Sequence, residues 1–144
     1  MTREIRLSTV LLVLRTVQQT LSNGLPLVVV ELPHAHSVSV AMMVRTGPRF
    51  EQPEENGLGH LVEHLLFRGT ASNPSSYQYH VAVESIGGEV NGLTQRDATT
   101  VHMTVVPAHT RRALELLAEV CVEPVLTGLG VERDVVLEEI LDST

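Results

Sequence analysis

Two histidines and a glutamate lie within five residues of one another, at His60, Glu63 and His64. Residues four apart on an α-helix lie one above the other, so the imidazoles of His60 and His64 can reach one point. A catalytic zinc ion accepts imidazole nitrogens at this spacing and keeps one position open for water. A carboxylate at Glu63, on the same side of the helix, can take a proton from that water and create a nucleophile at neutral pH. The spacing, H-x-x-E-H, is the reverse of the commoner H-E-x-x-H motif.

The alternative to a zinc site is a pair of surface histidines on an acidic helix. The presence of a third ligand would favour the zinc site. Three protein ligands are usual for a catalytic zinc. The acidic segment 131–140 supplies candidates, because Glu132 and Glu139 are seven residues apart and share one helix face. Glu138 points about 100° away from Glu139. An exposed acidic helix with pairing between its own charges is the other interpretation of this segment.

Three apolar residues, Val135, Val136 and Ile140, mark the side of this segment that is expected to pack inward. Glu132 and Glu139 lie close to that side, so we expect one or both carboxylates to be partly buried. A buried carboxylate needs a cation or strong hydrogen bonds. A zinc ion meets that need at Glu139, while Glu132 is placed to orient a zinc ligand.

The stretch 57–70, GLGHLVEHLLFRGT, resembles the zinc motif of the pitrilysin family of metallopeptidases. Three further blocks agree in order and spacing. Residues 21–30 are similar to the opening hairpin with its Asn-Gly turn, residues 87–94 to the strand before the active site, and residues 132–140 to the helix with the last zinc ligand. The resemblance runs from about residue 18 to the C-terminus.

The resemblance implies a Zn²⁺-dependent endopeptidase in which Glu63 is the general base and His60 and His64 are zinc ligands. Glu139 matches the third ligand, and Glu132 matches a functional glutamate seven residues before it. Glu138, one residue earlier, is a weaker alternative to Glu139 as the third zinc ligand.

Two neighbouring residues match the substrate site of the family. Asn91 corresponds to an asparagine beside the bound peptide, and Gly92 stands where the family usually has alanine. Glycine leaves a backbone contact possible but makes the strand more flexible. The expected substrate is a peptide or unfolded polypeptide, which adds as a strand at the sheet edge near residues 91–94.

Family chains are much longer, with a second related domain that closes over the substrate. The resemblance therefore implies a second pitrilysin-like domain or subunit as a partner. We interpret residues 18–144 as an incomplete N-terminal metallopeptidase domain and residues 1–17 as an N-terminal extension. The alternative is a zinc-binding, non-proteolytic fragment or subunit that needs a second domain for activity.

Composition limits the other classes of partner. The formal net charge of −7 argues against nucleic acid or an anionic membrane as the main partner. No apolar run approaches the roughly 18 residues that span a bilayer. Basic residues precede an apolar run near the start, but Glu4 interrupts them, Arg15 follows the run and no cleavage site is evident. We expect a cytoplasmic protein, with a periplasmic or secreted location left open, and interpret Cys121 as a small core residue.

Hydrophobic periodicity predicts the elements that must position these residues. Strands are expected at 25–32, 37–44, 89–95 and 98–106, and helices at the zinc motif, from 75 or 76 to 86, at 109–122 and in the acidic segment. Grouped pairs of strands and helices indicate an α+β domain, with a largely antiparallel sheet and helices packed on one face. His80, in the second helix, is expected to be structural or exposed.

Overall fold

The computed structural model describes residues 3–7 and 10–142, with side chains from residue 14 onward. The chain divides into two compact units, Met1–Ala35 and His36–Thr144. The boundary predicted after residue 17 falls instead inside strand β2 (Val10–Thr20), whose pairing with the next strand continues through that point. The physical reason is that β2 is one extended strand that pairs with the next strand along one part and with the preceding strand along the other. The sequence pattern gave no indication of the pairing with the preceding strand.

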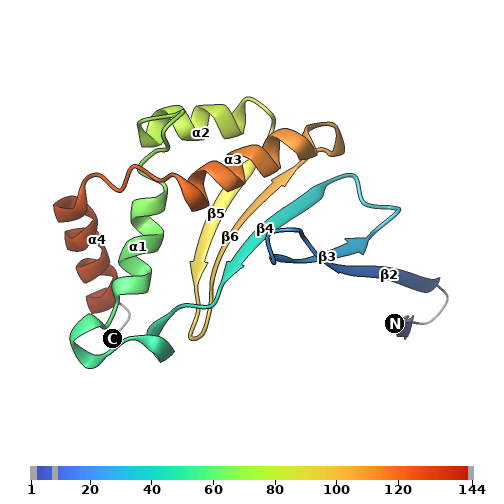
Figure 1. Cartoon of the computed structure of the whole chain (residues 1–144), viewed down its shortest axis with the longest axis horizontal. Helices are drawn as coiled ribbons and strands as arrows, with labels where there is room; N and C mark the ends of the chain where they lie inside the picture. The colour runs from blue at the N-terminus through green and yellow to red at the C-terminus, as the bar shows by residue number, and fades with distance from the viewer. Residues whose placement is uncertain (1–2, 8–9, 143–144) are drawn as a thin grey trace. The chain divides into compact units, whose positions relative to one another are not determined.

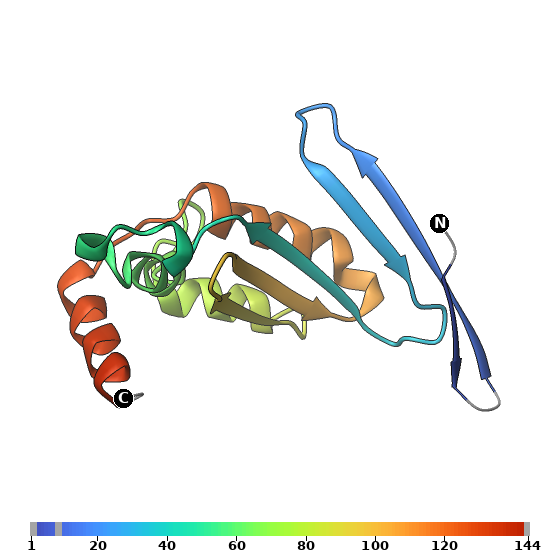
Figure 2. The ribbon, with the colours of Figure 1, turned by 90° about the horizontal axis from the view of Figure 1, so that it is seen from below.

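The first unit is a three-stranded antiparallel sheet in the order β1-β2-β3 (Figure 2). The segment 10–14 of β2 pairs with β1 (Arg3–Leu7), and the segment 15–20 pairs with β3 (Pro26–Glu31). The described part of the predicted N-terminal extension is therefore strand. The β2–β3 turn contains Asn23, whose Oδ1 accepts a hydrogen bond from the Leu25 N–H, and Gly24, with φ of 86°.

The second unit contains another three-stranded antiparallel sheet, in the order β4-β6-β5. These strands are β4 (Val38–Val44), β5 (Glu89–Thr94) and β6 (Thr99–Val105), and β5 forms one edge of this sheet. The predicted α+β class with antiparallel pairing is confirmed. The described strands form two sheets of three strands each rather than one larger sheet.

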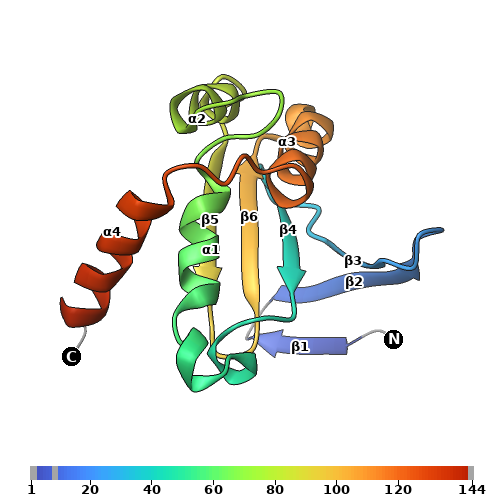
Figure 3. The same cartoon turned by 60° about the vertical axis from the view of Figure 1, so that its left-hand side comes forward.

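The core of this unit lies between its sheet and two helices, α2 (Ser76–Glu84) and α3 (Thr110–Val122). Alternation along β6 places its buried residues on one face, where they meet residues of both helices. The largest fully buried side chains there are Tyr79, Val83, Met103, Val105, Leu116 and Val120. The helices therefore cover one face of the sheet, as expected (Figures 1 and 3).

Helix α1 (Leu58–Leu66) lies along β5 on the same face, and α4 (Leu129–Asp142) lies beside α1 (Figure 3). The inward side of α4 is narrower than expected. Val136 is buried, whereas Val135 and Ile140 are 37% and 41% exposed, because α4 packs on α1 and does not reach the sheet core. Among the described residues, no helix is both long and apolar enough to cross a lipid bilayer.

Short 3-10 turns complete the described elements, at Pro48–Phe50, Pro53–Glu55 and Pro107–His109. The first two lie between β4 and α1. The boundaries of α2 and α3 agree with the predicted ones to within two residues, since capping residues and glycines end helices locally. Ser75, for example, caps α2 by accepting a hydrogen bond from the Gln78 N–H.

Candidate metal centre

Helix α1 positions three of the predicted site residues, and its start is anchored by a glutamate from the preceding loop. The N-cap residue, Gly57, has no side chain to satisfy the free N–H groups of the first turn. The two carboxylate oxygens of Glu51 accept hydrogen bonds from the N–H groups of Gly57 (2.8 Å) and Gly59 (2.7 Å). A negative charge at a helix N-terminus is favourable as well. Glu51 therefore fixes the start of the helix, which begins two residues before His60.

The structure brings His60, His64 and Glu139 together. The two Nε2 atoms are 3.2 Å apart, and Glu139 Oε2 lies 3.3 Å from His60 Nε2 and 3.5 Å from His64 Nε2. Zinc bonds of about 2.0–2.1 Å in a tetrahedron require ligand atoms roughly 3.3 Å apart. The three donor atoms thus have the chemistry and the separations that a zinc ion needs. Glu138, the alternative in register, is exposed and is not part of this group.

Glu132 holds the other nitrogen of His64. Its Oε2 lies 3.1 Å from His64 Nδ1, and its Oε1 accepts a hydrogen bond from Arg68 Nη1 at 3.1 Å. An Nδ1–H that donates to this carboxylate leaves the Nε2 lone pair directed at the donor triangle. Glu132 is buried, with 9% of the residue exposed, while the Glu139 side chain is half exposed. Of the two carboxylates expected near the inward side, Glu132 is the buried one.

Glu63 carries the one buried side-chain oxygen or nitrogen in the described part of the chain that lacks a hydrogen-bond partner, its Oε2. Buried polar atoms are nearly always paired, so an orphaned acceptor beside a candidate metal site is a functional indication. This orphan fits a proton-accepting role toward a water molecule at the centre.

Strand β5 comes very close to Glu63 at Gly92. A Cβ atom at position 92 would lie 2.7 Å from Glu63 Cγ and 2.9 Å from Phe67 Cε2. Glycine is the residue that permits this approach. Asn91 points to the other face of the strand, where its amide donates to Glu89 Oε1 at 3.0 Å. The two predicted substrate residues therefore differ, since Gly92 faces the centre and the Asn91 side chain turns away from it.

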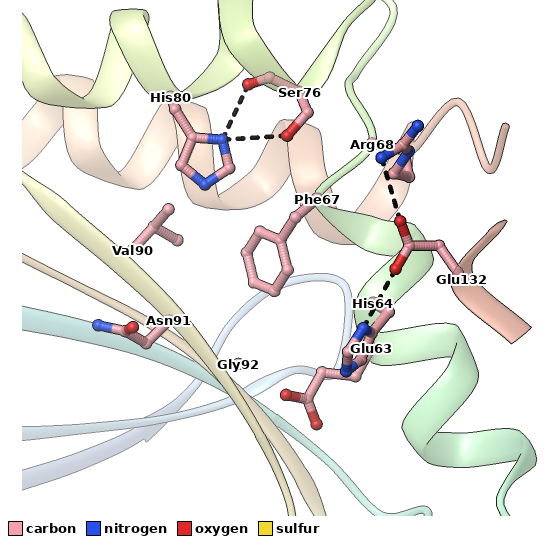
Figure 4. Close-up of a pocket in the computed structure, with 10 residues that line it drawn as sticks. All are labelled: Glu63, His64, Phe67, Arg68, Ser76, His80, Val90, Asn91, Gly92 and Glu132. Carbon is pink, nitrogen blue, oxygen red and sulfur yellow. Dashed lines mark hydrogen bonds and ion pairs between the residues drawn. The ribbon is translucent and has the colours of Figure 1, made fainter. Parts of the chain in front are cut away.

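A pocket of about 340 Å³ opens between α1, α2 and β5 (Figure 4). Its lining residues are Glu63, His64, Phe67, Arg68, Ser76, His80, Val90, Asn91, Gly92 and Glu132. His80, expected to be structural or exposed, is one of them, and its Nδ1–H donates to the Ser76 carbonyl at 2.8 Å. Sequence reasoning placed none of Phe67, Arg68 and Ser76 in the site, and considered Ser76 only as a possible helix cap. Phe67 and Arg68 follow His64 by three and four residues, so helical spacing from the motif was the available signal.

The family profile described as Insulinase (Peptidase family M16) matches residues 27–143. The chain belongs to this family. An uncharacterised zinc protease of Mycobacterium tuberculosis strain H37Rv is 39% identical over 127 residues, which cover 84% of this chain and 28% of that protein. The zinc protease YmxG of Bacillus subtilis is 35% identical over 123 residues, which cover 84% of this chain and 30% of that protein. The expected resemblance to zinc peptidases of the pitrilysin type is confirmed.

The insulinase-family relationship extends to a eukaryotic protein and to a solved structure. The beta subunit of the mitochondrial-processing peptidase of Dictyostelium discoideum is 30% identical over 122 residues, covering 83% of this chain and 26% of that one. The crystal structure of a protease from Helicobacter pylori superimposes with a TM-score of 0.79 at 30% identity, covering 88% of this chain and 30% of that one. This insulinase-family chain thus spans about 30% of the length of these relatives.

Proposed function

We propose that this chain is the zinc-binding part of a metalloendopeptidase that cleaves extended peptides. The observation that carries the proposal is the triangle of donor atoms from His60, His64 and Glu139, with separations of 3.2, 3.3 and 3.5 Å. Relatives named as zinc proteases support zinc as the ion. Zinc, when bound, supplies Lewis-acid chemistry, by which it polarises the scissile carbonyl and lowers the pKa of water to near 7.

The residues of this chain supply the remaining steps. Glu63 accepts the proton of the attacking water at its unpaired oxygen and passes it to the nitrogen of the leaving amine. Glu132 holds the His64 ring in the orientation and tautomer that a ligand needs. Burial of Glu132, together with Arg68 on its second oxygen, keeps this arrangement rigid.

Substrate binding is proposed at the edge formed by β5. This strand pairs with β6 on one side, and an extended peptide can add on the other side through backbone hydrogen bonds. One substrate side chain then enters the pocket beside Phe67, His80 and Val90. Recognition of this kind depends on backbone conformation, so it favours unfolded polypeptides over folded proteins.

The test is the variant Glu63→Gln, compared with Glu138→Gln at an exposed position on α4. Zinc content is measured after dialysis, and cleavage is measured on an unstructured fluorogenic peptide with and without a chelator. We expect E63Q to keep its zinc and lose cleavage, because the amide cannot accept the proton, while E138Q keeps both. Full chelator-sensitive activity in E63Q would show that Glu63 is not the base.

The second candidate function is zinc binding without turnover by the chain alone. It is favoured by the share of the relatives that the chain spans, about 30%. In this case, the wild-type chain binds zinc but leaves the peptide intact until a second insulinase-like domain or subunit is added. Cleavage by the isolated chain, abolished by the chelator and restored by zinc, would exclude this candidate.

A further inference from the structure

We propose that Arg68 is a positioning residue of the zinc centre, which acts through Glu132 to fix His64 and the start of α4. The inference rests on the proposed zinc site. It extends that proposal by one residue, whose side chain does not touch the ion's donor atoms and whose effect can be measured on metal binding alone.

The contacts form a continuous chain of polar groups. Arg68 Nη1 donates to Glu132 Oε1 at 3.1 Å, and Glu132 Oε2 lies 3.1 Å from His64 Nδ1 (Figure 4). The Glu132 side chain is 11% exposed, so solvent contributes little to its stabilisation. Without Arg68, the buried carboxylate loses its fixed cation and one of its two oxygens loses its donor. A carboxylate free to turn no longer holds the His64 ring in one orientation.

A second contact joins the same guanidinium to the residue before α4. A Cβ atom built on Gly128 would lie 3.1 Å from Arg68 Nη2 and 3.2 Å from Nε, so the guanidinium lies directly against the glycine backbone. Gly128 also has a φ of 81°, and its carbonyl accepts the hydrogen bond from the Glu132 N–H at 3.1 Å. Arg68 thus contacts both the turn that leads into α4 and the side chain of its first turn.

The backbone beside Arg68 strengthens this junction. The Val125 N–H donates to the Gly69 carbonyl at 2.9 Å, and the Ala71 N–H donates to the Glu123 carbonyl at 3.3 Å. The segment that follows α1 is therefore tied to the connection between α3 and α4. Glu139 lies two turns, about 10 Å, beyond Glu132 on the same helix face. A fixed start of α4 therefore determines where Glu139 meets the two histidines.

The experiment compares Arg68→Met with Arg112→Met in the full chain. Arg112 is a matched control, because its guanidinium also pairs with glutamates (Glu115 at 3.2 Å) and is similarly exposed, but on α3 away from the centre. The dissociation constant for Zn²⁺ is measured by competition with a chromophoric chelator at one fixed pH. We expect R68M to bind zinc about 10- to 100-fold more weakly, as when other outer partners of metal ligands are removed. R112M should match the wild type.

Two further variants separate positioning from general stability. Arg68→Lys keeps the charge but lacks the planar fork, so it should restore part of the lost zinc affinity. In a Glu132→Ala background, R68M should cause little further loss of zinc affinity, because the residue through which it acts is gone. Equal zinc affinity in R68M and R112M, or an undiminished R68M effect in the E132A background, would overturn the proposal.

The outcomes also separate this inference from the proposed function. A wild-type chain that binds no zinc contradicts the proposed zinc site itself. A wild-type chain that binds zinc, with R68M unchanged, contradicts the role of Arg68 and leaves the zinc site standing. If R68M fails to fold, Arg68→Gln carries the same comparison, and wild-type zinc affinity in R68Q overturns the inference.

Discussion

At the scale of single residues, helical spacing predicts the two histidine ligands but does not by itself choose the third ligand. The i,i+4 spacing predicts that His60 and His64 converge, and their Nε2 atoms lie 3.2 Å apart. The choice between Glu138 and Glu139 depends on a 100° rotation of α4 about its own axis, which tertiary packing sets. In the structure, the Glu139 carboxylate lies with the two histidines. Glu139, the candidate preferred over Glu138, is therefore the glutamate that reaches them.

Alanine variants of these adjacent glutamates test the ligand assignment. Glu139→Ala removes one of three donors, so zinc affinity should fall by at least about 100-fold, more than the loss of an outer partner costs. Glu138→Ala should leave zinc affinity unchanged, because that side chain is outside the donor group. Both dissociation constants come from chelator competition, and a larger loss in E138A than in E139A would reverse the register.

Other residues of the site were beyond sequence reasoning for a physical reason. The contact between Arg68 and Glu132 joins residues 64 apart, so no local spacing predicts it. His80 lies on a separate helix, and its place in the pocket depends on how α2 packs against β5. Local pattern identified the residues of the zinc motif and Glu132, while the contacts of Arg68 and His80 depend on tertiary structure.

At the scale of elements, Glu51 stabilises the start of α1 from the loop that precedes this helix. Glu51→Ala leaves the N–H groups of the N-cap and of Gly59 without acceptors, so the free energy of unfolding should fall by about 1–2 kcal/mol. Glu54→Ala, three residues away, is the control. Urea unfolding measures both, and zinc affinity should fall in E51A as well, because the start of α1 positions His60. Equal stability of the two variants would contradict the anchoring role.

The packing of α2 on α3 makes stability sensitive to alkaline pH. Burial, with smaller contributions from Cys121 and Glu119, raises the pKa of Tyr79 above its usual value, and burial raises the pKa of Cys121 to about 11. Both groups are favoured in their neutral form in the folded state. Their stabilising contribution is therefore complete below the unfolded pKa values, about 8.5 for cysteine and 10 for tyrosine, and is lost as pH rises through the folded values.

The free energy of unfolding should accordingly fall between about pH 8.5 and pH 11. Cys121→Ala should show a smaller fall over this range, because it lacks one of the two groups. Tyr79→Phe should also lose about 1 kcal/mol at neutral pH, since the Tyr79 hydroxyl donates to the Leu116 carbonyl at 3.2 Å. Denaturant unfolding at pH 7.5 and pH 10.5 gives these values. An identical pH dependence in the wild type and C121A would contradict the contribution of the thiol.

Element positions were predictable where one face of each element is buried. Alternation fixed the strands that became β4, β5 and β6, because a shift by one residue would expose the core face. The division of the strands into two sheets was not predictable, since β2 pairs with β1 and with β3 along different parts of its length. Alternation along a single strand does not reveal how many partners it has.

At the scale of the whole molecule, the site and the core belong to one unit. The residues of the metal centre and of the hydrophobic core cluster all lie within His36–Thr144. Among the side chains that the structure describes, those of the first unit supply none of these residues. A chain of residues 36–144 should therefore fold and bind Zn²⁺ with the affinity of the full chain.

A second truncation, to residues 18–144, makes the comparison sharper. It removes the segment of β2 that pairs with Val29, Val30 and Glu31, and keeps the part opposite Pro26–Val28. Val28, Val29 and Val30 are already 57%, 42% and 50% exposed, so the cut leaves an apolar strand with an unpaired edge. We expect this chain to aggregate at concentrations where residues 36–144 remain monomeric, as measured by size-exclusion chromatography with light scattering. If residues 36–144 fail to fold or lose zinc affinity while residues 18–144 keep both, the boundary after residue 17 is the better description of the domain.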